Sequence, residues 1–514
     1  MRADPRRMIS ERAPTRATSA LAGLLLLGGC GSPDDGVESF VIVGATVIDG
    51  TGAPGREVDV RILGDRIADV GSIELHPDEP VVEAHGLVLA PGFIDTHSHH
   101  DRGLTEMPEA LAAVSQGITT IVAGQDGGSP LPLVDFFSSL ERSPAAINVA
   151  AYAGHNTIRA AVMGEDYRRP ATEAEIEGMV ALLQEELAAG AIGLSTGLEY
   201  DPGIYSETGE VLTLARITAD AGGRYISHMR SEDRAFFEAL EELLTIARET
   251  GMPVQIGHMK LAMKSLWGRA AEVIEILDDA RAEGIDVTAD VYPYEFWQST
   301  MTVLFPDRDF TREAARFALE ELAPPDGMLI AAFEPDPSYV GMTLAEIAEV
   351  RGRPPVDVYL ELIAEVEAID GRESVIARSM ITEDIAILLA WPHTNVSSDG
   401  GLAGRHPRGF GAFTRVLGRH VRERGDLSLE DAVRKMTSLA ADHMGIAERG
   451  RIEAGHFADL VLFDPDSVLD LATPESPNEP SQGIEGVWVN GERVYSPRGP
   501  TGALPGRVIR GSIR

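Results

Sequence analysis

The sequence predicts an α/β protein in which a (β/α)8 barrel carries a small β-sandwich. The chain has 514 residues, which is enough for a barrel of roughly 250 to 400 residues and a small second domain. Within residues 89–445, apolar strand-like runs alternate with helical stretches, as in parallel βα units. Short runs of alternating apolar residues occupy both ends of the chain, and we expect residues 40–88 and 446–514 to pair into one sandwich.

The first residues are typical of an export signal. An Arg-containing segment leads into the apolar run at 21–27, which is too short for a stable membrane span. The stretch Leu27-Gly28-Gly29-Cys30 resembles a bacterial lipobox, in which the cysteine thiol receives a lipid, and Cys30 is the only cysteine of the chain. We therefore expect a signal peptide at 1–29, a tether at 30–39, and a lipoprotein anchored in the bacterial cell envelope, on the periplasmic or cell-surface side.

Eight apolar runs are candidate barrel strands, the number that a closed barrel needs. The helix type between them is shown by residues 172–189, which are rich in Ala, Glu and Leu with apolar residues at helical spacing. Residues from about 305 to 391 are too long for one βα connection, and we interpret them as an insertion. The predicted strands end at His97, Gly124, His155, Gly197, His228, His258, Tyr294 and Asp399.

The charge of the chain excludes some classes of partner. The formal net charge is −37 and the isoelectric point is near 4.7, so the surface repels the phosphates of nucleic acids and of anionic lipids. We expect no nucleic-acid partner, and membrane contact only through the lipid anchor. An anionic substrate would need a local cationic pocket, because the mean field of the protein opposes its approach.

Five residues at predicted strand ends are candidate metal ligands. His97 and His99 are two residues apart at the end of one strand, so their side chains share a face. His228, His258 and Asp399 end three further strands, and the carboxyl ends of barrel strands converge on one catalytic face. Four histidines and a carboxylate are ligands that zinc accepts, with a position left for water.

These segments resemble the amidohydrolase superfamily and, within it, the N-acyl-D-amino-acid deacylases (D-aminoacylases). The resemblance covers about residues 40–494. It implies a metallo-dependent hydrolase barrel that uses an activated water to hydrolyse the amide bond of a small N-acyl-D-amino acid. The motifs that carry it are Ala90-Pro91-Gly92-Phe93-Ile94-Asp95-Thr96-His97-Ser98-His99, Gly193-Leu194-Ser195-Thr196-Gly197-Leu198-Glu199-Tyr200, Ser227-His228-Met229-Arg230, Asp290-Val291-Tyr292-Pro293-Tyr294, Ser398-Asp399-Gly400, His406-Pro407-Arg408 and Gly455-His456-Phe457-Ala458-Asp459-Leu460-Val461.

The resemblance also implies how the ligands are shared. His228 and His258 would hold a tightly bound zinc, and His97, His99 and Asp399 a second, weaker divalent metal. In that family a cysteine after the second strand completes the first site, whereas this chain has Asp126 at the matching place. A carboxylate binds zinc and can bridge two metals, but this harder donor makes manganese, cobalt or a filled two-metal site more plausible.

Further roles follow from the same resemblance. Asp399 is the candidate base that removes the proton of the attacking water and then protonates the leaving amine. Lys260, Tyr292, Ser299 and Arg408 match positions that would line a pocket for the substrate carboxylate, and Arg suits bidentate capture. His155, at the end of the third predicted strand, is a weaker candidate for the pocket lining.

Three other functions fit parts of this pattern. A dipeptidase or a cyclic-amide hydrolase would share the metal residues and differ in the pocket. Cyclic-amide hydrolases typically use a carboxylated lysine on the fourth strand, and the matching run at 191–197 has no lysine. A non-catalytic binding module would be expected to lose the metal histidines, and this chain has them all. The acyl group and the preferred amino-acid side chain stay open at this point.

Overall fold

The structure is a computed structural model that describes residues 39–511. The predicted signal peptide at 1–29, Cys30 and the tether up to residue 38 lie outside the described residues. Within the described part of the chain, no helix has both the length and the apolar composition that crossing a membrane would require.

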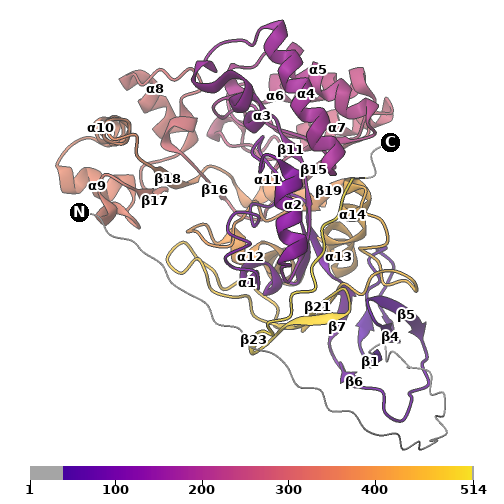
Figure 1. The fold of residues 1–514 in the computed structure, drawn as a ribbon. Coiled ribbons are helices and arrows are strands. Elements are labelled where there is room, and N and C mark those ends of the chain that lie inside the picture. The colour runs from indigo at the N-terminus through magenta and orange to yellow at the C-terminus, as the bar shows by residue number, and fades with distance from the viewer. Residues whose placement is uncertain (1–38, 512–514) are drawn as a thin grey trace, which may run out of the picture. The chain divides into compact units, whose positions relative to one another are not determined.

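The predicted barrel strands are present in the predicted order (Figure 1). Consecutive strands pair in parallel, and the third is interrupted at Tyr152 into β10 and β11. Their bounds are β8 (Phe93–Asp95), β9 (Ile118–Ala123), β10 (Asn148–Ala151), β11 (Ala153–Gly154), β12 (Gly193–Gly197), β13 (Arg224–His228), β14 (Val254–Ile256), β15 (Val287–Val291) and β19 (Thr394–Val396). The prediction of an α/β barrel is confirmed.

Contacts just beyond the carboxyl ends of β8 and β19 join the first and last strands. The Asp399 amide donates to the His97 carbonyl at 2.9 Å, and the His99 amide donates to the Gly400 carbonyl at 2.9 Å. The Ser398 amide and hydroxyl both donate to the buried Asp95 carboxylate, at 2.9 and 2.5 Å. The join therefore places His97 and His99 next to Asp399.

Helices cover the outside of the strands. The long helix predicted over residues 172–189 is α4 (Glu173–Ala189), which begins at a capping box of Thr172 and Glu175 and ends at the left-handed Gly190. The other helices around the strands are α1 (Leu111–Val114), α2 (Leu133–Arg142), α3 (His155–Met163), α5 (Thr208–Asp220), α6 (Phe236–Thr250), α7 (Ala270–Ala282), α11 (Thr382–Ala390), α12 (Arg408–Arg415), α13 (Leu429–Met436) and α14 (Ser438–Met444).

The insertion after β15 has its own antiparallel sheet. The strands β16 (Phe296–Ser299), β18 (Glu373–Arg378) and β17 (Met328–Phe333) lie in that order. The helices α8 (Arg312–Phe317), α9 (Leu344–Arg351) and α10 (Pro355–Glu367) accompany them. The insertion therefore begins and ends earlier than the predicted range 305–391. It begins earlier because β16 pairs with the distant β18. It ends earlier because α11 packs with α7, β15 and β19 and so belongs to the barrel.

The two ends of the chain form the predicted sandwich (Figure 1). Antiparallel pairing of β7 with β20 joins them, and Leu89 lies opposite Leu462. The two sheets share a core that includes Val60, Ile62 and Trp488. In the first sheet the strands lie in the order β5 (Arg66–Gly71), β4 (Asp59–Leu63), β1 (Ser39–Val43) and β6 (Val81–Glu83). In the second sheet the order is β23 (Gly499–Pro500), β22 (Glu492–Ser496), β21 (Ile484–Val489), β20 (Leu460–Phe463), β7 (Val88–Pro91), β2 (Thr46–Val47) and β3 (Arg56–Glu57).

The last described residues leave the sandwich and return to the barrel. The Val149 amide on β10 donates to the Arg507 carbonyl at 2.9 Å, and the Ile509 amide donates to the Val149 carbonyl at 2.8 Å. The predicted sandwich segment at 446–514 thus includes a tail that packs beside β10, which a search for alternating apolar residues could not distinguish.

Candidate active site

Six of the predicted residues form two overlapping groups at the carboxyl ends of the barrel strands. In each group one nitrogen or oxygen per side chain lies within 4.8 Å of the others. Asp126 belongs to both groups, so the two potential metal positions share its carboxylate. The first group is His97, His99, Asp126 and Asp399, and the second is Asp126, His228 and His258.

The Asp126 carboxylate faces three histidines at close range. Its Oδ1 is 3.2 Å from His97 Nε2 and 3.2 Å from His258 Nε2, and its Oδ2 is 3.1 Å from His99 Nε2. His228 Nδ1 is 2.9 Å from His258 Nε2, so these two ring nitrogens converge on the same point. This arrangement suits a carboxylate that contributes one oxygen toward each of two cations.

Backbone conformation helps to aim these side chains. Asp126, His258 and Asp399 follow β9, β14 and β19, and all three have positive φ angles, of 54°, 33° and 46°. Residues with a Cβ seldom adopt this left-handed conformation, and such strain is concentrated at functional sites. Each strand therefore turns sharply where its side chain enters the site.

The unpaired polar atoms of this cluster fit a metal ion. Both ring nitrogens of His97 and Oδ1 of Asp126 are buried without a hydrogen-bond partner among residues 39–511. Leaving such groups unpaired costs free energy that a bound cation would recover. The donors are imidazole nitrogens and carboxylate oxygens, which zinc and similar divalent ions accept, and the described chain has no cysteine to add a thiolate.

Two more carboxylates lie at hydrogen-bond distance from the far nitrogens of His228 and His258, and a third lies farther away, beside His97. Glu199 Oε2 is 2.8 Å from His228 Nε2, and Glu232 Oε1 is 2.9 Å from His258 Nδ1. Asp290 Oδ1 is 3.6 Å from His97 Nδ1. A carboxylate on the far nitrogen fixes the ring and its tautomer and makes the near nitrogen a better ligand. Glu199, His228 and Glu232 could also hold a cation together, but His228 Nδ1 points to Asp126, so we assign both glutamates to this supporting role.

The charges of the cluster shift its proton affinities. Burial alone would raise the pKa of Asp399, but the charges of Arg408 and His258 hold it well below its usual range. Burial also opposes ionisation of Asp126, yet His97 and His258 hold its pKa well below the usual range. Burial lowers the pKa of His228 to about 4, so this ring is neutral near pH 7, as a metal ligand must be.

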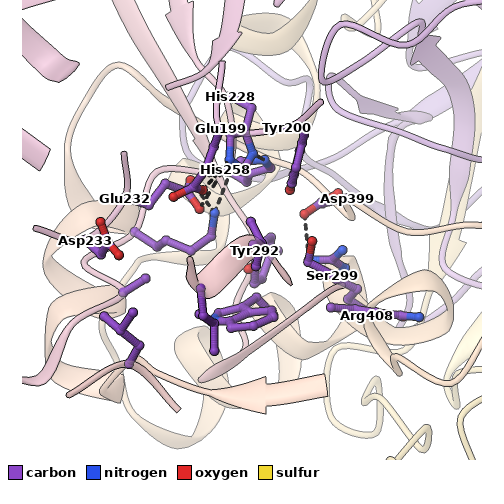
Figure 2. Close-up of a pocket in the computed structure, with 17 residues that line it drawn as sticks. Glu199, Tyr200, His228, Glu232, Asp233, His258, Tyr292, Ser299, Asp399 and Arg408 are labelled. Atoms are coloured by element: carbon purple, nitrogen blue, oxygen red, sulfur yellow. Dashed lines mark hydrogen bonds and ion pairs between the residues drawn. The ribbon is translucent and has the colours of Figure 1, made fainter. Parts of the chain in front are cut away.

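Two cavities meet at the cluster, and Figure 2 shows the residues that line the inner one. The inner cavity has a volume of about 40 Å³, and the outer cavity has a volume of about 500 Å³. Both are lined by Tyr200, Gln298, Ser299, Asp399 and Arg408. The inner cavity alone reaches Lys260 and Tyr292, and the outer one alone reaches His99 and Asp126.

The four predicted carboxylate-binding residues all line the inner cavity. Arg408 forms an ion pair with Asp399 at 2.6 Å, and its guanidinium lies 4.7 Å from the centre of the Tyr292 ring. Lys260 Nζ is 2.5 Å from Glu232 Oε1 and 2.7 Å from His258 Nδ1. Among the described residues, Tyr292 Oη and Arg408 Nε have no hydrogen-bond partner although they are buried, so these donors can serve a bound anion.

His155 does not line either cavity, so its predicted role is wrong. It is the first residue of α3 and fully buried, and its Nε2 lies 2.8 Å from Glu210 Oε1 on α5. Arg159 pairs with the same glutamate. The histidine therefore belongs to a buried network between two helices, which its position after a strand could not reveal.

Sequence reasoning missed several residues of the site. Glu199 and Tyr200 end a motif already noted after β12, and the Tyr200 ring lies 4.3 Å from that of His228. Glu232 follows His228 by four residues. A carboxylate close to a ligand histidine was a usable signal for both glutamates. Trp297 on β16 had no signal, because only the fold brings the insertion to the inner cavity.

A family comparison agrees with this geometry. The model described as amidohydrolase family matches residues 80–326 and 341–495. The chain belongs to the amidohydrolase family. The paired histidines after β8 and the histidines after β13 and β14 thus lie at the strand ends of an amidohydrolase barrel.

Three named relatives of this amidohydrolase are deacylases. It is 38% identical to a D-aminoacylase of Alcaligenes xylosoxydans xylosoxydans, over 91% of this chain and 97% of the relative. An N-acyl-D-aspartate deacylase of the same organism is 39% identical, over 91% and 94%. The solved N-acyl-D-glutamate deacylase of Bordetella bronchiseptica, complexed with zinc and a phosphonate that mimics the tetrahedral intermediate, has a TM-score of 0.83 at 37% identity, over 92% of this chain and 99% of that chain.

The shared Asp126 leads to a prediction about metal content. Replacing Asp126 with Ala should remove most of both metal equivalents, because both ligand groups lose an oxygen. Replacing His99 with Ala should leave about one equivalent, since His99 belongs to the first group alone. Elemental analysis after reconstitution with zinc measures both. Equal losses in the two variants would contradict a shared carboxylate.

Proposed function

We propose that this protein is a zinc-dependent N-acyl-D-amino-acid deacylase. One observation carries the proposal: a metal-ligand cluster adjoins an inner cavity in which the buried donors Tyr292 Oη and Arg408 Nε lack partners. The cluster can activate water, and the donors can hold a carboxylate beside the amide. The deacylase relatives, one of them complexed with zinc, support the substrate class and the metal.

The residues divide the work of holding the ion. His228 and His258 with one oxygen of Asp126 would hold one zinc, and His97, His99, Asp399 and Asp126 a second divalent ion. When bound, the metal supplies Lewis acidity, which polarises the amide carbonyl and makes water nucleophilic near neutral pH. Glu199 and Glu232 keep the two histidine rings in place.

Asp399 is placed to move the proton of the reaction. Its carboxylate borders both cavities, so it faces the point where an acyl group in the outer cavity joins an amino acid in the inner one. As an ionised carboxylate it can accept the proton of the attacking water. The same group then returns a proton to the amide nitrogen, which must be protonated to leave.

Arg408, Tyr292, Ser299 and Lys260 hold the substrate carboxylate. Arg408 offers a planar guanidinium that suits a carboxylate. Because Arg408 also forms an ion pair with Asp399, a substrate carboxylate bound to it would lie beside the proposed base. Lys260 lies 5.6 Å from the centre of the Tyr292 ring on the inner side of the site. This anchor would fix the amide between Asp399 and the metal ligands, which is the main use of remote binding energy in a hydrolase.

The alternative functions have less support. In cyclic-amide hydrolases a modified lysine on the fourth strand typically bridges the metals, whereas β12 has none and the shared position is held by Asp126. A non-catalytic module would not need six ligands that converge on one point. A dipeptidase differs from a deacylase only in the group that occupies the outer cavity, and the deacylase relatives favour the latter.

A substrate screen tests the proposal. N-acetyl-D-amino acids should be hydrolysed with a kcat/KM at least about 100-fold above that of their L enantiomers, since one enantiomer alone can place its amide and its carboxylate together. Release of free amine from matched D and L pairs measures this ratio, with dipeptides and a hydantoin as comparison substrates. Faster hydrolysis of the hydantoin than of any N-acetyl-D-amino acid would refute the proposal.

The role of Asp399 gives a second test. Asp399→Asn should lower kcat by on the order of 10²- to 10⁴-fold, because Asn keeps the shape but cannot take a proton. The variant should keep about one metal equivalent, held by Asp126, His228 and His258. Turnover and metal content are measured on one preparation. Near-normal turnover would mean that another group is the base, and loss of all metal would mean that Asp399 is mainly a ligand.

We also propose that the mature protein is a lipoprotein anchored in the cell envelope through Cys30, on the strength of the lipobox-like Leu27-Gly28-Gly29-Cys30. Cys30→Ser should leave activity intact and move the protein from the membrane to the soluble fraction, as immunoblots of fractionated cells would show. Membrane attachment of this variant would contradict the proposal.

A further inference from the structure

The inner cavity contains a carboxylate that neither the metal cluster nor the substrate anchor uses. Asp233 lines this cavity and is 7% exposed. Its Oδ1 accepts hydrogen bonds from the Ser231 hydroxyl at 2.6 Å and the Arg234 amide at 2.5 Å. Across residues 39–511 no Lys, Arg or His side chain forms an ion pair with it, and the neighbouring Arg234 guanidinium instead lies 3.9 Å from the centre of the Phe317 ring.

The cations of the inner cavity are already paired with other acids. Lys260 is 2.5 Å from Glu232, and Arg408 is 2.6 Å from Asp399. Glu199 adds a further carboxyl group to the lining. The lining of the cavity thus has more carboxyl groups than cationic side chains, and a buried carboxylate without a counter-charge is costly. A negatively charged substrate side chain would add to this excess.

The position of Asp233 suits the end of a substrate side chain. Figure 2 shows it on the side of the cavity away from Asp399 and Arg408, where the amide and its carboxylate are placed. The wall of the cavity also includes apolar side chains, which a methylene chain can contact. These are Ala262, Trp297, Val303, Leu304 and Leu322, most of them supplied by the insertion.

We propose that this deacylase selects D-amino acids with a basic side chain, whose methylenes pack on the apolar wall and whose ammonium or guanidinium pairs with Asp233. The inference rests on the proposed function and adds to it the class of side chain. A neutral side chain would remove water from Asp233 without replacing its charge, and an acidic one would be repelled. Sequence identity does not decide which substrate side chain is preferred, because a D-aminoacylase and an N-acyl-D-aspartate deacylase are 38% and 39% identical to the chain.

The test compares two substrates that differ only in the charge. N-acetyl-D-lysine and N-acetyl-D-norleucine share a four-carbon side chain, and lysine adds the ammonium. The wild-type enzyme should favour the lysine substrate by at least about 10-fold in kcat/KM, as expected for a charge-assisted hydrogen bond in a dry cavity. N-acetyl-D-glutamate should be the slowest of the three.

A pair of variants attributes the preference to Asp233. Asp233→Asn should bring the lysine-to-norleucine ratio close to one while metal content stays near the wild-type value. The control is Asp220→Asn, which changes an exposed carboxylate at the end of α5 and should preserve the ratio. Binding of the free products D-lysine and D-norleucine, measured by calorimetry, should show the same preference and the same loss.

The outcomes separate this inference from the proposed function. Norleucine turnover equal to or faster than lysine turnover in the wild type, or an unchanged ratio in Asp233→Asn, would overturn the inference and leave the deacylase standing. Absence of turnover with every N-acetyl-D-amino acid would refute the deacylase. In that case the binding of the free amino acids would still test the cation site at Asp233. Tighter binding of D-lysine than of D-norleucine, with the difference lost in Asp233→Asn, would support the site. Equal binding of the two would overturn the site.

Discussion

The structure of the site depends on one electrostatic constraint, the burial of many ionisable side chains around the Asp126 carboxylate. Isolated charges of this kind would be strongly destabilising in a protein interior. Here Asp126 lies between His97, His99 and His258, with Oδ1 beside His97 and His258 and Oδ2 beside His99. The barrel must bring the ends of separate strands to one point for this compensation to work, and a divalent cation completes it.

The supporting parts of the fold serve this cluster. Hydrogen bonds between the segments after β8 and β19 set His97 and His99 beside Asp399. Glu199 and Glu232 hold the far nitrogens of His228 and His258, and positive φ angles turn the chain where the ligands enter. These features fix ring tautomers and directions before any ion or substrate binds, which is the preorganisation that catalysis needs.

The residues proposed for the hydrolysis and those proposed to contact the substrate side chain lie in different parts of the two cavities. The ligand groups and the Arg408–Asp399 pair lie where both cavities meet, so this part suits any N-acyl amino acid. The lining of the inner cavity combines a barrel loop, through Asp233, with the insertion, through Trp297 and Leu322. Loops and insertions on a rigid barrel are the usual place where specificity changes while the reaction is kept.

The sequence by itself determined the barrel and the sandwich, and it singled out the residues that the structure gathers into the two candidate ligand groups. Period-two and helical patterns are local, and a histidine pair on a strand end points to one face whatever surrounds it. It also placed Asp126 correctly between the two ligand groups. Only the tertiary structure decided which groups face each other across the chain. His155 follows a strand like the true ligands, yet Glu210 from a later helix holds it in a buried network. Asp233 looks like an ordinary loop residue, and the absence of a paired cation among the described residues is visible only when the distant insertion closes the cavity. Pairing, burial and charge balance are sums over residues far apart in sequence, so local patterns cannot supply them.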